Sequence, residues 1–200
     1  QANIISIRQK QALGLGHAIL CGEPVLGGEP FAVLLGDEIT MGDKPETNLT
    51  AELCKAFEAT QGSTVSVMHV EDRDVSKYGI ADVEKIKDHL YRVNSLIEKP
   101  KPEAVQSRWA LTGRYVFESD IISWLKMARP SVNGEIQLTD SMNFLAQKKE
   151  MYAMTFQGSR YDAGDKLGYL AANVELGLKH PEVGPDFKKY LIDFVSKLKK

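Results

Sequence analysis

The chain has 200 residues, of which 43% are apolar and 26% charged, and a formal net charge of -2. This length is enough to bury one substantial core, and the balanced charge argues against a nucleic-acid partner, which would need a basic surface. No apolar run reaches the roughly 18 residues of a membrane span and no basic-then-apolar leader opens the chain, so we expect a cytoplasmic protein without a membrane partner.

The first part of the chain alternates predicted strands with helices. A strand is expected over 3–7, directly after Gln1, and the lack of an initiator Met or a polar lead-in indicates a cut end. A turn at 14–16 opens a helix, and the apolar strand 31–35 follows and stops at Asp37. A helix near 51–59 and a β-branched strand over 64–70, typical of a strand covered on both faces, come next.

The middle of the chain contains three closely spaced extended runs, at 78–84, 90–98 and 109–117. They leave no room for crossover helices, so we expect them to pair largely antiparallel. The remaining pattern predicts helices at 119–128 and 135–148, a strand at 151–157, a loop at 158–164, and helices at 165–179 and 185–198. Together these elements predict a layered α/β domain with an antiparallel insertion.

Two carboxylates stand at positions suited to a metal ion. Asp37 ends an apolar strand, at the sheet edge where ligands bind in open α/β folds, and Asp162 lies in a Gly-rich corner between a strand and a helix. Facing one crevice, they could hold Mg²⁺, which takes one or two carboxylates plus phosphate oxygens. Each also has a structural interpretation, Asp37 as a turn residue and Asp162 as the N-cap of helix 165–179.

A second candidate site is the Glu98-Lys99 pair, which Pro100 holds on a stiff backbone. The lysine can neutralise a phosphate and the carboxylate can accept hydrogen bonds from sugar hydroxyls, although a solvated loop is the alternative. The turn at 14–16 is not a complete dinucleotide fingerprint, and no P-loop occurs. The two cysteines, Cys21 and Cys54, have no metal spacing and fit a reducing compartment.

Short motifs occur in order over nearly the whole chain. They are Arg8-Gln9, Leu13 to Ala18, Leu35-Gly36-Asp37, Tyr78-Gly79, Glu98 to Lys101, Gly113-Arg114-Tyr115, Gly134 to Asp140 and Asp162 to Tyr169. In this combination the chain resembles the bacterial UTP:glucose-1-phosphate uridylyltransferases, or UDP-glucose pyrophosphorylases, of the sugar nucleotidyltransferase family. Each motif is short, but their shared order makes coincidence a poor explanation.

The resemblance implies the nucleotide-diphospho-sugar transferase fold, which is Rossmann-like, with a mixed, mostly parallel sheet flanked by helices. It implies a catalytic domain over 1–180 that lacks its first strands, and a C-terminal helix over 181–200 that packs on the domain or on a subunit partner. The expected substrates are UTP and glucose 1-phosphate, the cofactor is Mg²⁺, and the intact enzyme is expected to be a homo-oligomer. The products would be UDP-glucose and pyrophosphate.

The resemblance also implies roles for individual residues. Asp37 and Asp162 would carry the Mg²⁺, and Lys99 would neutralise the sugar phosphate. The positions expected to meet the substrates are Gln9 and Gly14 at the uracil and Gly79, Glu98, Gly113 and Glu135 at the glucose. Tyr78 is expected to support the sugar-binding wall without touching the sugar.

One departure from the family pattern has a functional consequence. The family's Gly-rich, Gly-Thr-Arg-containing loop and its downstream Lys, which grip the nucleotide phosphates, are not found in this sequence, so we expect the 200 residues alone to be inactive or nearly so. The alternatives are a thymidylyl or cytidylyl transferase on the same scaffold and a non-catalytic regulatory relative.

Overall fold

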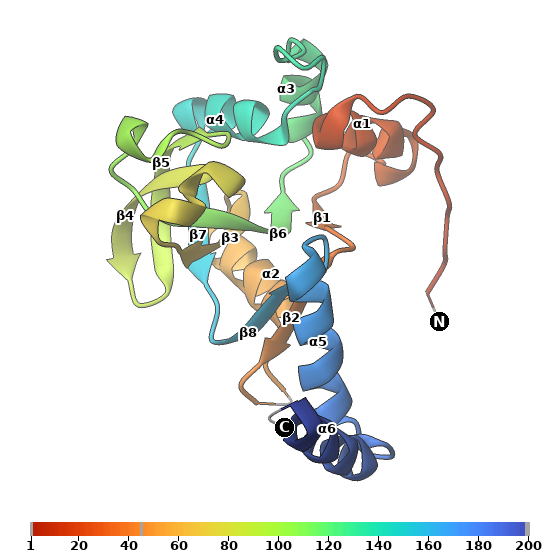
Figure 1. Cartoon of the computed structure of the whole chain (residues 1–200). Helices are drawn as coiled ribbons and strands as arrows, with labels where there is room; N and C mark the ends of the chain where they lie inside the picture. Colours follow the sequence, from red (N-terminus) through yellow and green to blue (C-terminus); the bar gives the residue numbers. More distant parts are fainter. Residues whose placement is uncertain (1, 45, 199–200) are drawn as a thin grey trace.

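The computed structural model describes residues 2–44 and 46–198 (Figure 1). The helices are α1 (Gly14–Leu26), α2 (Leu49–Thr60), α3 (Ile121–Met127), α4 (Leu138–Lys148), α5 (Lys166–Lys179) and α6 (Gly184–Leu198). The strands are β1 (Phe31–Leu34), β2 (Glu38–Gly42), β3 (Thr64–His69), β4 (Ile80–Lys87), β5 (Leu90–Ile97), β6 (Trp109–Phe117), β7 (Tyr152–Thr155) and β8 (Gly158–Asp162). Within the described ranges, no helix is long and apolar enough to cross a membrane.

The main sheet has the strand order β1-β6-β3-β7-β5-β4. The predicted α/β class with a mixed sheet is confirmed, but the expectation of mostly parallel pairing is wrong. Among the described strands only β3 and β7 pair parallel, and the other pairings in this sheet are antiparallel. β5 and β6 account for this, because each runs opposite to every strand with which it pairs.

The antiparallel insertion is confirmed. β4 pairs antiparallel with β5 and, at its first residues, with β6. Ile80 lies opposite Ile97 of β5 and Ala110 of β6, so the start of β4 is held on both sides. This double pairing fixes the loop before β4, which contains Tyr78 and Gly79, against the ends of the neighbouring strands.

The core is divided between the two faces of the sheet, as β6 shows. Tyr115 and Phe117 join the larger apolar cluster, which includes residues of α1, α3 and α4. Val116, between them, packs with Leu49 and Leu53 of α2. Because successive side chains of a strand point to opposite faces, α2 covers one face of the sheet, and α1, α3 and α4 cover the other (Figure 1).

A small second sheet, formed by β2 and β8, was not predicted. The two strands pair antiparallel from Glu38 opposite Asp162 to Gly42 opposite Gly158. The sequence had indicated a loop at 158–164, because Gly158 and the polar residues after it are typical of a turn. Long-range pairing with β2 makes most of this segment a strand instead.

Two further expectations are corrected. Residues 3–7 form no strand, and Ile4 is 90% exposed, so the β-branched run lacks a pairing partner among the described residues. The helix expected over 135–148 begins at Leu138, because the preceding residues form a turn in which the Gly134 N–H donates to the Ser131 carbonyl. The other predicted strands and helices are confirmed within a few residues.

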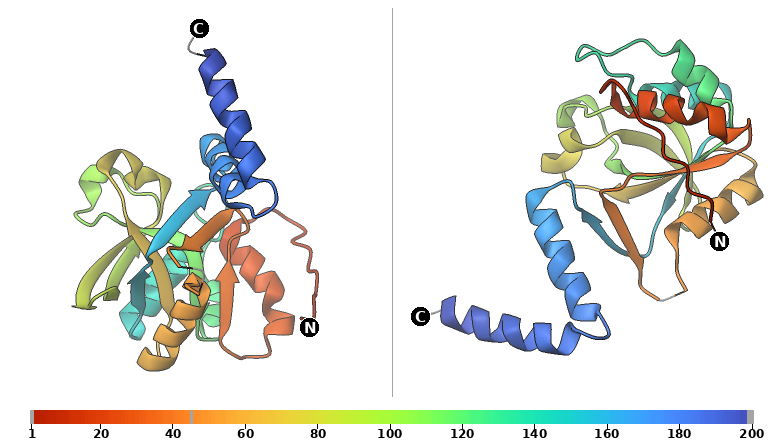
Figure 2. Two further views of the ribbon diagram at one scale, coloured as in Figure 1. Left: turned by 90° about the horizontal axis from the view of Figure 1, so that it is seen from below. Right: turned by 90° about the vertical axis from the view of Figure 1, so that its right-hand side faces the viewer.

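The last two helices form an arm that extends away from the sheets and the other helices (Figure 2). α5 contacts β8, and α6 in turn packs on α5, where the Phe187 ring lies against Gly177. The rest of α6 presents large apolar side chains to the exterior, namely Tyr190, Ile192, Phe194, Val195 and Leu198.

Candidate active site

The β2–β8 pair brings the two predicted metal ligands to one place. Asp37 immediately precedes β2, and Asp162 ends β8 opposite Glu38. The Ala163 N–H donates to the Asp37 carbonyl at 2.8 Å, which extends the ladder past the end of β8. Two residues separated by more than a hundred positions in the sequence therefore lie side by side.

The carboxylates of Asp37 and Asp162 both face Gly164. A methyl group on Gly164 would lie 2.9 Å from Oδ2 of Asp37 and 3.1 Å from Oδ1 of Asp162, so the two side chains approach the same point. Asp162 Oδ1 accepts the N–H groups of Gly164 at 3.0 Å and Asp165 at 3.2 Å. The N-cap of α5 is Asp165, whose carboxylate accepts the Gly168 N–H, so the interpretation of Asp162 as that N-cap is wrong.

This arrangement fits a divalent cation that is shared with a phosphate. In the part of the chain that the structure describes, no group of three or more His, Cys, Asp or Glu side chains is arranged to hold a metal by itself. Mg²⁺ needs only one or two carboxylates when substrate phosphates supply further oxygens. The missing side chain of Gly164 leaves space next to both carboxylates, so the residues present fit such an ion.

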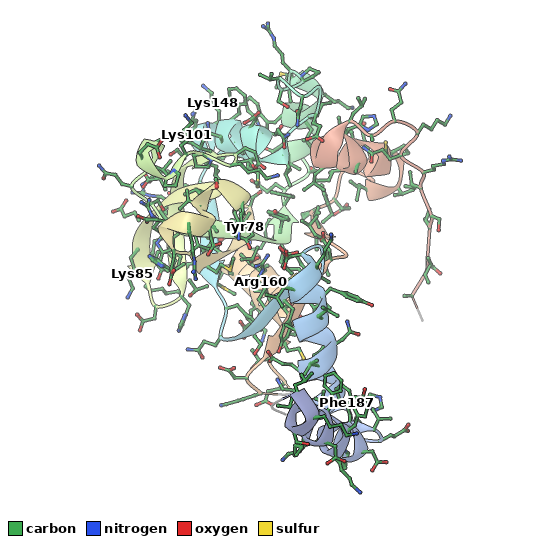
Figure 3. The ribbon with its side chains drawn as sticks, in the orientation of Figure 1. Tyr78, Lys85, Lys101, Lys148, Arg160 and Phe187 are labelled. Atoms are coloured by element: carbon green, nitrogen blue, oxygen red, sulfur yellow. The ribbon has the colours of Figure 1, made fainter. Side chains whose placement is uncertain are left out.

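A buried ion pair lies directly beside the two carboxylates. Arg160 of β8 donates from Nε to Glu38 Oε2 at 2.7 Å and from Nη2 to Oε1, which makes a two-bond contact. Its Nη1 lies 3.4 Å from the Tyr78 hydroxyl, and its Nη2 is 3.8 Å from Asp162 Oδ2. The labelled Tyr78 and Arg160 lie close together at the centre of the molecule in Figure 3.

The burial of this pair shifts both pKa values. Burial raises the pKa of the Glu38 carboxyl, and the bonds from Arg160 oppose that rise. Burial alone would lower the pKa of Arg160, but its bonds to Glu38 and Tyr78 raise it above the usual value. The guanidinium therefore stays charged, and its bonds to Glu38 partly offset the cost of burying that carboxylate.

Gly113, a predicted sugar-binding position, lies against the same pair. Its φ of 71° falls in the left-handed region that favours glycine, and a methyl group there would lie 2.6 Å from Glu38 Cγ. The next residue, Arg114, donates to the carbonyls of Leu35 at 2.8 Å and of Glu38. β6 is thereby attached to both ends of the turn that carries Asp37.

The predicted sugar-binding wall is brought together as well. A methyl group on Gly79 would lie 3.1 Å from Glu98 Oε2, and the same carboxylate oxygen accepts the Thr139 hydroxyl at 2.5 Å. Lys99 has a φ of 41°, an unusual conformation for a non-glycine residue, and its N–H donates to the Tyr78 carbonyl at 3.1 Å. The Lys99 side chain is 61% exposed, so its ammonium group is accessible to a ligand. Its Nζ lies 3.8 Å from Glu98 Oε1.

The predicted uracil-binding residues, Gln9 and Gly14, form a third group. Gln9 Nε2 donates to the Gly14 carbonyl at 3.1 Å and lies 2.9 Å from His17 Nδ1. Gly14 contacts the 131–140 segment, since a methyl group on it would lie 2.8 Å from Glu135 Cβ. The Leu13 carbonyl accepts the Ile136 N–H at 2.8 Å and secures this contact.

The carboxylate pair, the sugar-binding wall and the uracil-binding residues are connected to one another by direct contacts, and we call this region the carboxylate edge. A cavity of about 550 Å³ is lined by Glu98, Lys99 and Glu135 together with Ser131, Val132, Asn133, Gln137 and Asp140. Tyr78 connects this cavity to the carboxylates, because its carbonyl holds Lys99 and its hydroxyl meets Arg160. All the predicted site residues are thus placed at this edge.

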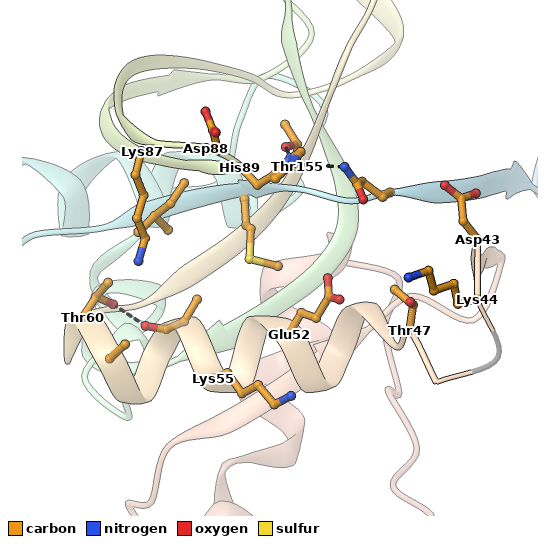
Figure 4. A pocket seen from close by; sticks show the side chains of 15 residues that line it. Asp43, Lys44, Thr47, Glu52, Lys55, Thr60, Lys87, Asp88, His89 and Thr155 are labelled. Atoms are coloured by element: carbon orange, nitrogen blue, oxygen red, sulfur yellow. Dashed lines mark hydrogen bonds between the residues drawn. The ribbon is translucent and has the colours of Figure 1, made fainter.

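Another cavity, of about 480 Å³, lies between α2 and the β4–β5 hairpin (Figure 4). Its lining includes Lys55, Lys87 and His89 but none of the predicted site residues. We take the carboxylate edge as the candidate site, because Asp37 and Asp162 approach one point there and the Glu38–Arg160 pair joins β2 to β8 beside them.

The sequence did not single out Glu38, Arg160, Arg114 or Thr139 as site residues. A signal for Arg160 was present, because residues two apart in a strand share a face and Arg160 is two positions before Asp162. The predicted loop over 158–164 hides this signal, because a loop has no fixed alternation of faces. The contact between Arg160 and Glu38 depends on the β2–β8 register, which no local pattern encodes.

The comparison with protein families agrees with this geometry. The nucleotidyl transferase profile matches residues 1–177. The chain belongs to the nucleotidyl transferase family. Among its relatives is the UTP--glucose-1-phosphate uridylyltransferase YngB of Bacillus subtilis (strain 168), which is 44% identical over 196 residues. The alignment covers 98% of this chain, and the chain spans 65% of the relative's length.

Solved structures of family members show the same fold. The UTP-bound UGPase from Acinetobacter baumannii superposes with a TM-score of 0.84 at 36% identity, covering 95% of this chain and 65% of that chain. A UDP-glucose pyrophosphorylase complexed with UDP-glucose gives a TM-score of 0.82 at 36% identity, covering 87% of this chain and 66% of that chain. The family resemblance drawn from the short motifs is confirmed.

Proposed function

We propose that this chain provides the sugar- and metal-binding part of an enzyme that forms UDP-glucose and pyrophosphate from UTP and glucose 1-phosphate. The observation that carries the proposal is the convergence of Asp37 and Asp162 on one point, on the same edge as Glu98 and Lys99. The names of the relatives support the choice of UTP and glucose. The chain matches only part of those proteins, so the activity is a proposal for this one.

In the proposed reaction an oxygen of the glucose 1-phosphate attacks the α-phosphorus of UTP. The new P–O bond forms as the bond to the bridging oxygen breaks, and pyrophosphate leaves with that oxygen. No covalent step falls to the protein, which must position two anions and offset the charge that builds up between them. A bound Mg²⁺, held by Asp37 and Asp162, would neutralise phosphate oxygens.

The remaining residues have matching roles in this proposal. Lys99 places an accessible ammonium group beside the cavity and would neutralise the sugar phosphate. Glu98 and Glu135 line that cavity and would accept hydrogen bonds from glucose hydroxyls, while Gly79 and Gly113 let the backbone approach the sugar closely. Gln9 and Gly14 would meet the uracil.

The test is an assay of the protein encoded by the complete reading frame, with each of UTP, dTTP and CTP and with glucose 1-phosphate. UDP-glucose formation with a clear preference for UTP supports the proposal. A preference for dTTP or CTP would move it to the thymidylyl or cytidylyl alternative, and nucleotide-sugar binding without turnover would indicate a regulatory relative. The expectation that the 200 residues alone form little or no UDP-glucose stays a prediction, tested in the same assay.

We also propose that the protein assembles with a second copy through α6, in line with the expected homo-oligomer. Phe187, Tyr190 and Phe194 stack along one side of the helix, and the last two are 60% and 46% exposed. Asp186 in the first turn and Lys197 in the last turn carry opposite charges, so an antiparallel pair of α6 helices would match acid with base at both ends.

Light scattering on the purified protein tests this assembly. Phe194→Asp should lower the measured mass to that of a monomer, whereas Ser196→Asp adds the same charge outside the aromatic stripe and should leave the mass unchanged. A wild-type monomer, or an assembly that survives Phe194→Asp, would contradict the role of α6.

We propose a cytoplasmic location as well, in line with the two free cysteines, Cys21 and Cys54. Cell fractionation would test it.

A further inference from the structure

The acid that follows Asp37 has a different environment from the two candidate metal ligands. Both oxygens of the Glu38 carboxylate accept hydrogen bonds from Arg160, and the side chain is only 9% exposed. Glu38 is therefore not free to serve as a third metal ligand, although it follows Asp37 in the chain and lies opposite Asp162 in the β2–β8 register.

The guanidinium group of Arg160 is likewise occupied by contacts within the protein. Its three guanidinium nitrogens reach Glu38 and the Tyr78 hydroxyl, its Cζ lies 5.2 Å from the centre of the Tyr78 ring, and its side chain is 16% exposed. With these contacts made, the guanidinium has little capacity left for a substrate phosphate. Its bonds join β8, which carries both Arg160 and Asp162, to Glu38 of β2, and this indicates a supporting role instead.

Stability alone is a weak reason for such a pair. Removing two charges from water costs free energy that their attraction often fails to recover, so a buried ion pair is better explained by the geometry that it specifies. Here it joins β2 to β8 at the level of Asp37 and Asp162, and Arg114 attaches the same turn to β6 through the carbonyls of Leu35 and Glu38.

We infer that Glu38 and Arg160 are positioning residues that set the distance between the Asp37 and Asp162 carboxylates, and that they determine metal affinity without touching the metal. The inference rests on the proposed function of the two aspartates. Residues that orient metal ligands in this way typically change metal affinity about 10–100-fold when replaced.

The test measures Mn²⁺ binding by electron paramagnetic resonance in the complete reading-frame protein with UDP-glucose present. Arg160→Lys keeps the charge but loses the two-bond geometry, so we expect Mn²⁺ to bind about tenfold more weakly. The matched control is Arg92→Lys, which alters the exposed ion pair of Arg92 with Glu84 on β5 and β4 and should change the affinity less than twofold.

Two further variants keep the outcome decisive. Tyr78→Phe removes only the hydroxyl that contacts Arg160, and this substitution is small enough to leave the fold intact. It should weaken Mn²⁺ binding about twofold. Asp162→Asn should abolish the bound signal if the proposed metal site is right. Circular dichroism and thermal melting show whether each variant is folded.

The outcomes separate the two proposals. If Asp162→Asn leaves Mn²⁺ binding unchanged, the proposed metal site is wrong. If Asp162→Asn abolishes binding while Arg160→Lys binds Mn²⁺ as the wild type does, the positioning role is wrong. A folded Arg160→Met variant that binds Mn²⁺ as tightly as the wild type, or more tightly, would also overturn the inference.

Discussion

The carboxylate edge and the pocket between α2 and the β4–β5 hairpin differ in how their charged side chains are held. At the edge, Arg160 and Arg114 connect three strands through Glu38 and the turn that carries Asp37. In the pocket, Asp88 pairs with Lys85 of its own hairpin, and the bonds that the His89 ring makes to another element go to the uncharged side chains of Thr155 and Gln157. The cavities are of similar size, about 550 Å³ and 480 Å³, so the approach of the Asp37 and Asp162 carboxylates to one point, and not the volume, distinguishes the candidate site.

The largest expected difference between the two regions comes from removing one carboxylate charge in each. Asp162→Asn should lower kcat in UDP-glucose synthesis about 10³-fold, because charge stabilisation of the transferring phosphates is lost. Asp43→Asn makes the same change in the pocket and should leave kcat within about twofold of the wild type, as surface substitutions usually do. Similar losses for both variants would break the distinction.

Filling the space between the carboxylates should have the next largest effect. In Gly164→Ala the new methyl would lie 2.9 Å from Asp37 Oδ2 and must displace it, so we expect kcat to fall about 10²-fold. Gly22→Ala is the control, because nothing lies within 4 Å of the methyl that it would introduce in α1. Steady-state kinetics at saturating metal would show whether the two variants differ.

A smaller effect is expected at the sugar-binding wall. Glu98→Gln keeps the shape of the side chain but weakens hydrogen bonds that sugar hydroxyls would donate, so KM for glucose 1-phosphate should rise about tenfold. KM for UTP should not change. Glu52→Gln, in the other pocket, serves as the matched variant. If Glu98→Gln raised KM for glucose 1-phosphate and KM for UTP equally, a general loss of structure would be indicated.

The smallest effect should come from the pocket itself. Lys87→Met removes a cation from its lining, and we expect less than a twofold change in either KM, as for other exposed substitutions. A large change in the UTP KM would mean that the pocket takes part in substrate binding. The comparison between the two regions would then need to be reversed.

The parts of this site that the sequence revealed are those that depend on local position. Asp37 was recognisable because it ends an apolar strand, and Glu98 and Lys99 because Pro100 stiffens the chain after them. The pairing of Glu38 with Arg160 could not be read from the sequence, because it depends on the register between two short strands that are distant along the chain.

The same reasoning explains the errors in the fold. The β-branched run at 3–7 has the composition of a strand, but such a preference is expressed only where a neighbouring strand and a packed face exist. Conversely, 158–162 has a poor strand composition and becomes one through pairing with β2. The direction of β6 likewise follows from its place in the sheet and not from its own residues.

The most direct test of the central claim is an anomalous-scattering map from crystals of the complete reading-frame protein grown with Mn²⁺ and UDP-glucose. The account predicts a manganese peak between the carboxylates of Asp37 and Asp162, next to Gly164, with Glu38 still bonded to Arg160. A peak in the pocket between α2 and the hairpin, or an ordered nucleotide sugar with no metal at the two aspartates, would contradict it.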